Sequence, residues 1–161
     1  MRRLIALAGL VGSFVLVAFT GWGDASVRRA HAAATVPVVI VKARDGETLA
    51  LVRVTVHGRA FPFLIDTGSS KTLVDVALAR KLHLNTVGRP IQVTGVGCSE
   101  TARKVKLSRW SIGGQPLPNI IGTSAVIAGA GGKAFGLLGS DILSHFGAIA
   151  LDYAHGQLTL G

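Results

Sequence analysis

A glycine turn that directly follows a short apolar run is the feature of this chain that most restricts its fold. The run is Phe61-Pro62-Phe63-Leu64-Ile65, and the turn that ends it is Asp66-Thr67-Gly68-Ser69. Burying a charge is unfavourable unless it is paired or hydrogen-bonded, so a carboxylate at the end of a buried strand needs a reason. The reason can be structural, because aspartate often caps a turn through its own side chain. It can also be chemical, and the tripeptide alone leaves both readings open.

A second block lies in the other half of the chain. Leu137-Leu138-Gly139 ends an apolar stretch and leads, through a short segment at 140–146, to the closing Leu151-Asp152-Tyr153. The two blocks in this order resemble the retropepsin-like aspartic proteases, in particular the small exported bacterial members. The resemblance covers about residues 38–160 and includes the helix expected after Gly139. It implies a mostly β fold, a closed acid-protease β-barrel with two short helices, active as a homodimer.

The resemblance also assigns roles to the residues of both motifs. Asp66 becomes the catalytic carboxylate of an aspartic-type endopeptidase. Thr67 is expected to hydrogen-bond across the dimer, and Gly68 to allow close backbone approach where a Cβ would obstruct. The Ser69 hydroxyl could donate to Asp66 and favour its ionised form, which predicts an acidic pH optimum. The segment expected to support the aspartate loop from beneath is Leu137, Leu138 and Gly139.

A single Asp66 is chemically insufficient for this reaction. Hydrolysis by carboxylates needs one ionised group to take a proton from water and one protonated group to polarise the carbonyl. The chain has no second Asp-Thr-Gly, and none of Asp75, Asp141 and Asp152 combines the apolar approach and the glycine exit of Asp66. An isologous dimer would bring two Asp66 side chains together across a two-fold axis, with a water held between them.

The tip of a predicted hairpin is rich in glycine. Gly95, Val96, Gly97 and Cys98 resemble the flap that closes over substrate in this clan, although an ordinary turn has the same composition. Cys98 is the only cysteine, so no intrachain disulfide is possible. We expect it to be passive, and coupling of two flaps by oxidation is the alternative.

The N-terminus has the order of a secretory signal peptide. Met1-Arg2-Arg3 is basic, the stretch 4–19 is almost wholly apolar, and small residues follow at 30–34. Residues 1–34 are therefore expected to be a cleaved signal peptide and short linker, or an uncleaved membrane anchor. Residues 35–161 are expected to form one exported domain, periplasmic or extracellular, that meets a membrane only if the N-terminal segment is retained.

The remaining pattern is that of many short strands. Strands are expected at 36–41, 48–56, 61–65, 72–74, 91–96, 101–110, 120–127 and 148–160, the last of them folded into a hairpin. Short helices are expected from Asp75, as the N-cap, to about Leu82, and over 142–146. In the second strand Ala50, Val52, Val54 and Val56 share one face. The absence of βαβ alternation favours a mostly antiparallel β structure.

Other chemistries find little support. The chain carries a formal charge of +9, but its cations are scattered, and the cluster Arg103, Lys104, Lys106 and Arg109 reads as the solvated face of one strand. We therefore expect no nucleic-acid partner. The histidines lack metal-ligand spacing, and the 129–133 stretch fails as a phosphate loop, so no metal or cofactor is expected.

Three functions remain to be compared. The first is peptide hydrolysis by the Asp66 pair. The second is a catalytically inactive peptide-binding or scaffold module on the same fold, since fold does not fix function. The third is a basic module that acts at the cell envelope through surface charge.

Overall fold

The computed structural model describes residues 33–42, 46–95, 98–127 and 132–161. Nearly all of the predicted N-terminal segment, residues 1–34, lies outside them, and so do Val96 and Gly97. Within the described ranges, no helix is both long and apolar enough to cross a membrane.

The described chain is dominated by strands that form one sheet. The strands are β1 (Ala34–Lys42), β2 (Thr48–Val56), β3 (Arg59–Ile65), β4 (Leu73–Asp75), β5 (Thr86–Gly95), β6 (Cys98–Leu107), β7 (Trp110–Ile112), β8 (Gln115–Pro116), β9 (Ile120–Ala125), β10 (Gly136–Leu138), β11 (Ile149–Asp152) and β12 (Gln157–Leu160). The helices are α1 (Val76–Lys81), α2 (Ser140–Leu143) and the 3-10 turn η1 (Ser144–Phe146).

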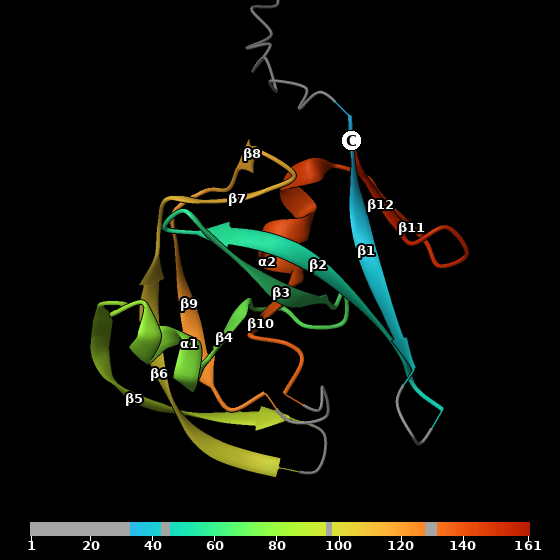
Figure 1. Cartoon of the computed structure of the whole chain (residues 1–161). Coiled ribbons are helices and arrows are strands. Elements are labelled where there is room, and N and C mark those ends of the chain that lie inside the picture. Colours follow the sequence, from blue (N-terminus) through green and yellow to red (C-terminus); the bar gives the residue numbers. More distant parts are fainter. Residues whose placement is uncertain (1–32, 43–45, 96–97, 128–131) are drawn as a thin grey trace, which may run out of the picture.

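The sheet is open, which corrects the predicted closed barrel. Its strands follow the order β11-β12-β1-β2-β3-β10-β4-β9-β6-β5, with β7 joined to β2 and β8 to β7. In the described chain β11 and β5 therefore remain two separate edges, as Figure 1 also shows. The fold is mostly β with two short helices, as predicted.

The centre of the sheet mixes parallel and antiparallel pairs. The short strand β10 runs parallel to β3 and antiparallel to β4, and β4 runs parallel to β9. This arrangement places the end of β3, where Asp66 lies, beside Leu138 at the end of β10. Two segments about seventy residues apart in sequence thus meet at one edge of the core. Pairing between such distant segments leaves no local pattern in the amino-acid sequence.

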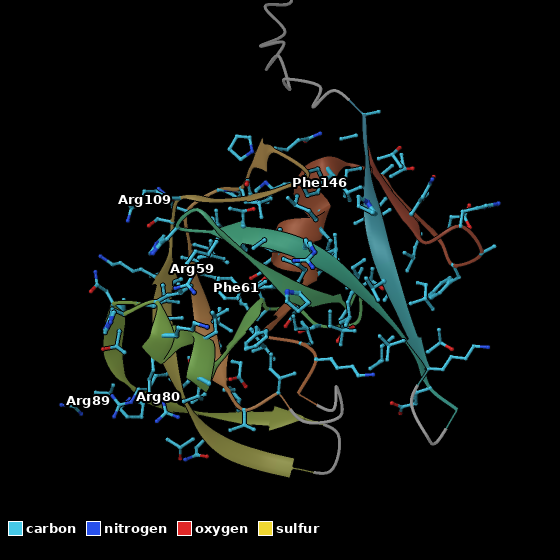
Figure 2. The ribbon with its side chains drawn as sticks, in the orientation of Figure 1. Arg59, Phe61, Arg80, Arg89, Arg109 and Phe146 are labelled. Carbon is cyan, nitrogen blue, oxygen red and sulfur yellow. The ribbon has the colours of Figure 1, made fainter. Side chains whose placement is uncertain are left out.

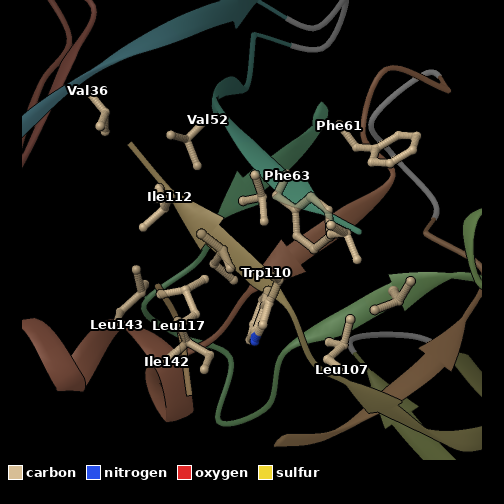
Figure 3. Close-up of a cluster of buried hydrophobic side chains, with 14 of the residues drawn as sticks. Val36, Val52, Phe61, Phe63, Leu107, Trp110, Ile112, Leu117, Ile142 and Leu143 are labelled. Atoms are coloured by element: carbon tan, nitrogen blue, oxygen red, sulfur yellow. The ribbon is translucent and has the colours of Figure 1, made fainter. Parts of the chain in front are cut away.

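The core lies under the strands whose alternation was read from the sequence. Ala50, Val52, Val54 and Val56 are all buried. Phe63 on β3 is fully buried with them, and Figure 3 shows it near Trp110 and Ile112. Helix α2 closes the other side of this cluster, with Ile142 and Leu143 beside Leu117 (Figure 3).

Helix α1 begins where the sequence predicts. The Asp75 side chain accepts a hydrogen bond from the Ala77 backbone N–H at 2.8 Å and so caps the first turn. Arg80 and Lys81 lie in the last turn, which suits the negative end of the helix dipole. The helix packs against β4 and β9 through Leu78 and Ala79, its buried residues.

Several predicted boundaries differ from the structure. The strand predicted at 91–96 already begins at Thr86, with a register shift between Val87 and Ile91 that accommodates Gly88 and Pro90. The strand predicted at 101–110 is divided, because Arg109 adopts φ 50° and redirects Trp110 into β7. The helix predicted at 142–146 begins at Ser140, and its last residues form the 3-10 turn.

Candidate active site

The Asp66 turn is fixed by its own backbone. One carboxylate oxygen, Oδ1, accepts the N–H groups of Gly68 at 2.9 Å and Ser69 at 3.2 Å. The Asp66 N–H donates to the Leu138 carbonyl at 3.1 Å, which ties the turn to β10. From the described residues no hydrogen bond reaches the other oxygen, Oδ2. The half-buried carboxylate is therefore held by one oxygen and presents the other.

The glycine after Thr67 allows the carboxylate its position. A Cβ on Gly68 would lie 3.3 Å from Asp66 Oδ1, closer than nearly all side-chain contacts. Thr67 itself is exposed at the tip of the turn, where its side chain is accessible to another molecule. Its predicted bond across a dimer stays a prediction.

The second motif lies directly behind the turn. Leu137 and Leu138 are buried in β10, and the Ser69 carbonyl accepts the N–H and the hydroxyl of Ser140 at 2.8 and 3.0 Å. A Cβ on Gly139 would stand 2.6 Å from the backbone carbon of Lys71. Only glycine permits the two segments to pack this closely.

A buried polar contact that the sequence reasoning missed joins the same segments. Thr72 is fully buried, and its N–H and hydroxyl donate to the two oxygens of Asp141 at 3.1 and 2.8 Å. The Thr72 oxygen in turn accepts the Gly139 N–H at 3.2 Å. The sequence analysis treats Asp141 only as a candidate for the second catalytic acid. The one sequence signal for this contact is a threonine shortly after one glycine turn and an aspartate shortly after the other.

The predicted role of the Ser69 hydroxyl is wrong. Its oxygen donates to the Lys71 carbonyl at 2.8 Å rather than to Asp66. Ser69 approaches the carboxylate only through its backbone N–H. The hydroxyl therefore shapes the turn, and the argument for an acidic optimum that depended on it no longer applies.

A groove of about 780 Å³ extends from the Asp66 turn across the neighbouring strands. Asp66, Ser69, Ser70 and Lys71 line it at the turn. Ile91 and Val93 of β5 contribute apolar side chains to its lining. The groove is thus open to an extended ligand and contains the candidate carboxylate.

The predicted flap is the end of the β5–β6 hairpin. Gly95 pairs with Cys98 across the two strands, and Val96 and Gly97 between them lie outside the described residues. Because Ile91 and Val93 of the same hairpin line the groove, strand β5 of this hairpin is part of the candidate site. The role of its tip, including that of Cys98, stays a prediction.

The four residues of the basic cluster are all exposed, as predicted, but they do not share one face of a strand. Lys104 lines the groove, whereas its neighbour Arg103 lines a separate cavity of about 580 Å³ beside α1. Arg109 follows the end of β6. Adjacent strand residues point to opposite faces, which the prediction for these four cations overlooked. Within the described ranges, no group of three or more His, Cys, Asp or Glu side chains is arranged to hold a metal ion.

Known proteins share both the sequence pattern and the fold. The family model described as aspartyl protease matches residues 52–142, more than half of the chain. The crystal structure of a retropepsin-like aspartic protease from Rickettsia conorii is similar, with a TM-score of 0.53 and 22% identity over 80% of this chain and 90% of that one. At 22% identity this similarity is evidence for a shared fold. None of the curated proteins matches the chain.

Proposed function

Because the chain belongs to the aspartyl protease family and has the retropepsin-like fold, we propose that it is an endopeptidase with Asp66 as its catalytic residue. The observation that carries the proposal is the environment of that carboxylate. Backbone amides hold Oδ1. Oδ2 has no hydrogen-bond partner among the described residues, and Asp66 lines the groove. A water or a second carboxyl group is the natural partner for that oxygen.

The reaction needs two carboxylates, and among the described residues that line the groove Asp66 is the only one. We therefore propose that the second is Asp66 of another copy, brought close by a two-fold axis. Two carboxylates about 3 Å apart cannot both ionise, so the pair would share one proton. The ionised member takes a proton from the attacking water, and the protonated member polarises the peptide carbonyl.

The residues around the pair have separate tasks in this proposal. Thr67, exposed at the tip of the turn, would bond to the facing copy, and Gly68 would let the two turns approach. Leu137, Leu138 and Gly139 form the base against which the turn is held. The β5–β6 hairpin would close over an extended peptide and exclude bulk water.

We also propose that the protein acts after export, because the sequence of its N-terminus has the pattern of a signal peptide. A basic start, an apolar run and a small-residue site precede the domain. Comparing the mass of the protein recovered from the envelope with that of the full chain would show whether this segment is removed.

The proposed pair can be tested by mixing subunits. The full chain is incubated with a mixed peptide library from acidic to neutral pH, beside Asp66→Asn. We expect cleavage by wild type and none by the variant. When the two are mixed and allowed to exchange, activity should follow the square of the wild-type fraction, since a mixed dimer lacks one carboxylate.

Three outcomes would contradict the proposal. A linear dependence of activity on the wild-type fraction would show that one chain suffices. Cleavage that survives in Asp66→Asn would remove the carboxylate from the reaction. Peptide that binds to wild type but is never cleaved would favour the inactive binding module, and sedimentation at several concentrations measures the dimer independently.

A further inference from the structure

We propose that the groove selects peptides that carry an acidic side chain several residues from the scissile bond, beside apolar side chains. The inference rests on the proposed function, since it concerns what the same groove would bind. It is drawn from the charges, the strand register and the exposed apolar side chains of the groove.

The charge of the groove is nearly all of one sign. Of the described residues that line it, Lys71, Arg89 and Lys104 are basic, and only Asp66 is acidic. All three cations are exposed. Arg89 belongs to the edge strand β5 and lies at the outer edge of the molecule (Figure 2). If Asp66 is committed to the reaction, the rest of the groove offers positive charge alone.

The register places Lys104 on the floor of the groove. Lys104 pairs with Val87 on one side and with Thr123 on the other. Thr123 pairs with Leu73, and Leu73 with Leu137. Cross-strand partners share a face of the sheet, and all five of these residues line the groove. The ammonium group is thus part of one continuous row that leads from β5 to β10.

Along this row Lys104 lies several strand spacings from β10, the strand beside the Asp66 turn. Neighbouring strands lie about 4.8 Å apart, so Lys104 is about two spacings from Leu73 and three from Leu137. A residue of an extended peptide spans about 3.3 Å. An acidic side chain that meets Lys104 therefore belongs several residues from the bond that is cut, whereas Lys71 lies on the Asp66 turn itself.

The uncharged part of the groove has exposed apolar side chains, which would favour apolar residues in the peptide. Ile121 is 53% exposed and Val126 63% exposed, two of the four large apolar side chains most exposed in the described chain. Both line the groove. Apolar side chains gathered in a recess indicate a binding surface. The recess therefore suits a peptide in which an acidic residue accompanies apolar ones.

Paired peptides test the inference directly. A cleavable apolar peptide is prepared with Glu or Gln at each position in turn, and kcat/KM is measured with the full chain. We expect Glu to be preferred at one or more positions away from the cut. Lys104→Met should reduce the largest preference about two- to fivefold, the range of a partly exposed ion pair, and Lys71→Met should act at a position nearer the cut.

Lys42→Met is the matched control. Lys42 ends β1 and does not line the groove, and its replacement makes the same change in net charge. It should leave the Glu-to-Gln ratio unchanged. The preference should also weaken with added salt and fade as the pH falls below about 4.3, where the peptide Glu becomes protonated.

The inference is separable from the proposed function. Binding of the same peptides to Asp66→Asn, measured by fluorescence anisotropy, reports selection even if wild type cleaves nothing. Equal kcat/KM and equal binding for Glu and Gln peptides at every position would overturn the inference while leaving hydrolysis intact. An equal loss of preference in Lys42→Met would overturn it too, since net charge alone would then explain the effect.

Discussion

Thr72 donates its backbone N–H and its hydroxyl to the two carboxylate oxygens of Asp141, which lies 69 residues further along the chain. The same hydroxyl oxygen accepts the Gly139 N–H. The turn that carries Asp66 and the turn that follows β10 are therefore joined by three hydrogen bonds through one buried residue, two of them made by its hydroxyl and one by its backbone N–H. Any displacement of Thr72 would move the support beneath the candidate carboxylate.

Thr72→Val should lower the free energy of unfolding by about 1–3 kcal/mol. The substitution keeps the volume but leaves part-buried Asp141 and the Gly139 N–H without the hydroxyl. Urea unfolding measures the change, and Thr72→Ser, which keeps the hydroxyl, should recover part of it. Thr159→Val, at an exposed position of β12, is the control and should stay within about 0.5 kcal/mol of wild type. Equal effects at the two sites would contradict the role given to the hydroxyl.

Gly139→Ala should destabilise the fold by at least about 1–3 kcal/mol, the usual cost of overpacking. The new Cβ would stand 2.6 Å from the Lys71 backbone, which cannot move aside as the end of a flexible side chain could. Thermal and urea unfolding would both report it. Gly161→Ala provides the comparison, because the nearest heavy atom there is 3.8 Å away. A neutral Gly139→Ala would mean that the two turns can separate without cost.

The fold was predictable where its determinants are local. Alternation marked the buried face of β2, and Asp75 marked the start of α1 through a bond to a residue only two positions away. The openness of the sheet was not predictable in this way. It depends on whether the two end strands, β11 and β5, pair with each other, and they are far apart in sequence. The place of β10 between β3 and β4 was hidden for another reason, because a strand of three residues carries too few side chains to show a period.

The candidate site divides in the same manner. Asp66 and Gly68 stand together in the sequence, so their motif could be read directly. The contact of Thr72 with Asp141 and the direction of Lys104 depend on the register of distant strands. The Ser69 hydroxyl was assigned to Asp66 because the two are neighbours, but the turn brings the Lys71 carbonyl to it.

Ser69→Ala should leave the acidic limb of the pH profile of kcat/KM in place. The Ser69 hydroxyl donates to Lys71, and the hydrogen bonds to Asp66 Oδ1 come from backbone N–H groups that alanine retains. Ser70→Ala, which alters the next residue lining the groove, is the matched control. A shift of the acidic limb by more than about half a pH unit in Ser69→Ala alone would show that the hydroxyl acts on the ionisation of the reacting group.

The β11–β12 turn should contribute a pH-dependent part of the stability through Asp152. The pKa of Asp152 is lowered from its usual 3.8, first by the hydrogen bond from the His155 backbone and then by that from the His155 ring. A lowered pKa in the folded state stabilises the fold fully above pH 3.8, and this contribution is lost as the pH falls through the lowered value. Wild type should therefore exceed Asp152→Asn in Tm at pH 5–6, with the difference shrinking below pH 3.8.

His155→Ala should keep part of that dependence, because the Ala154 and residue-155 backbone N–H groups still reach Oδ1. A difference between wild type and Asp152→Asn that stays constant from pH 6 to pH 2, or grows as the pH falls, would contradict this account.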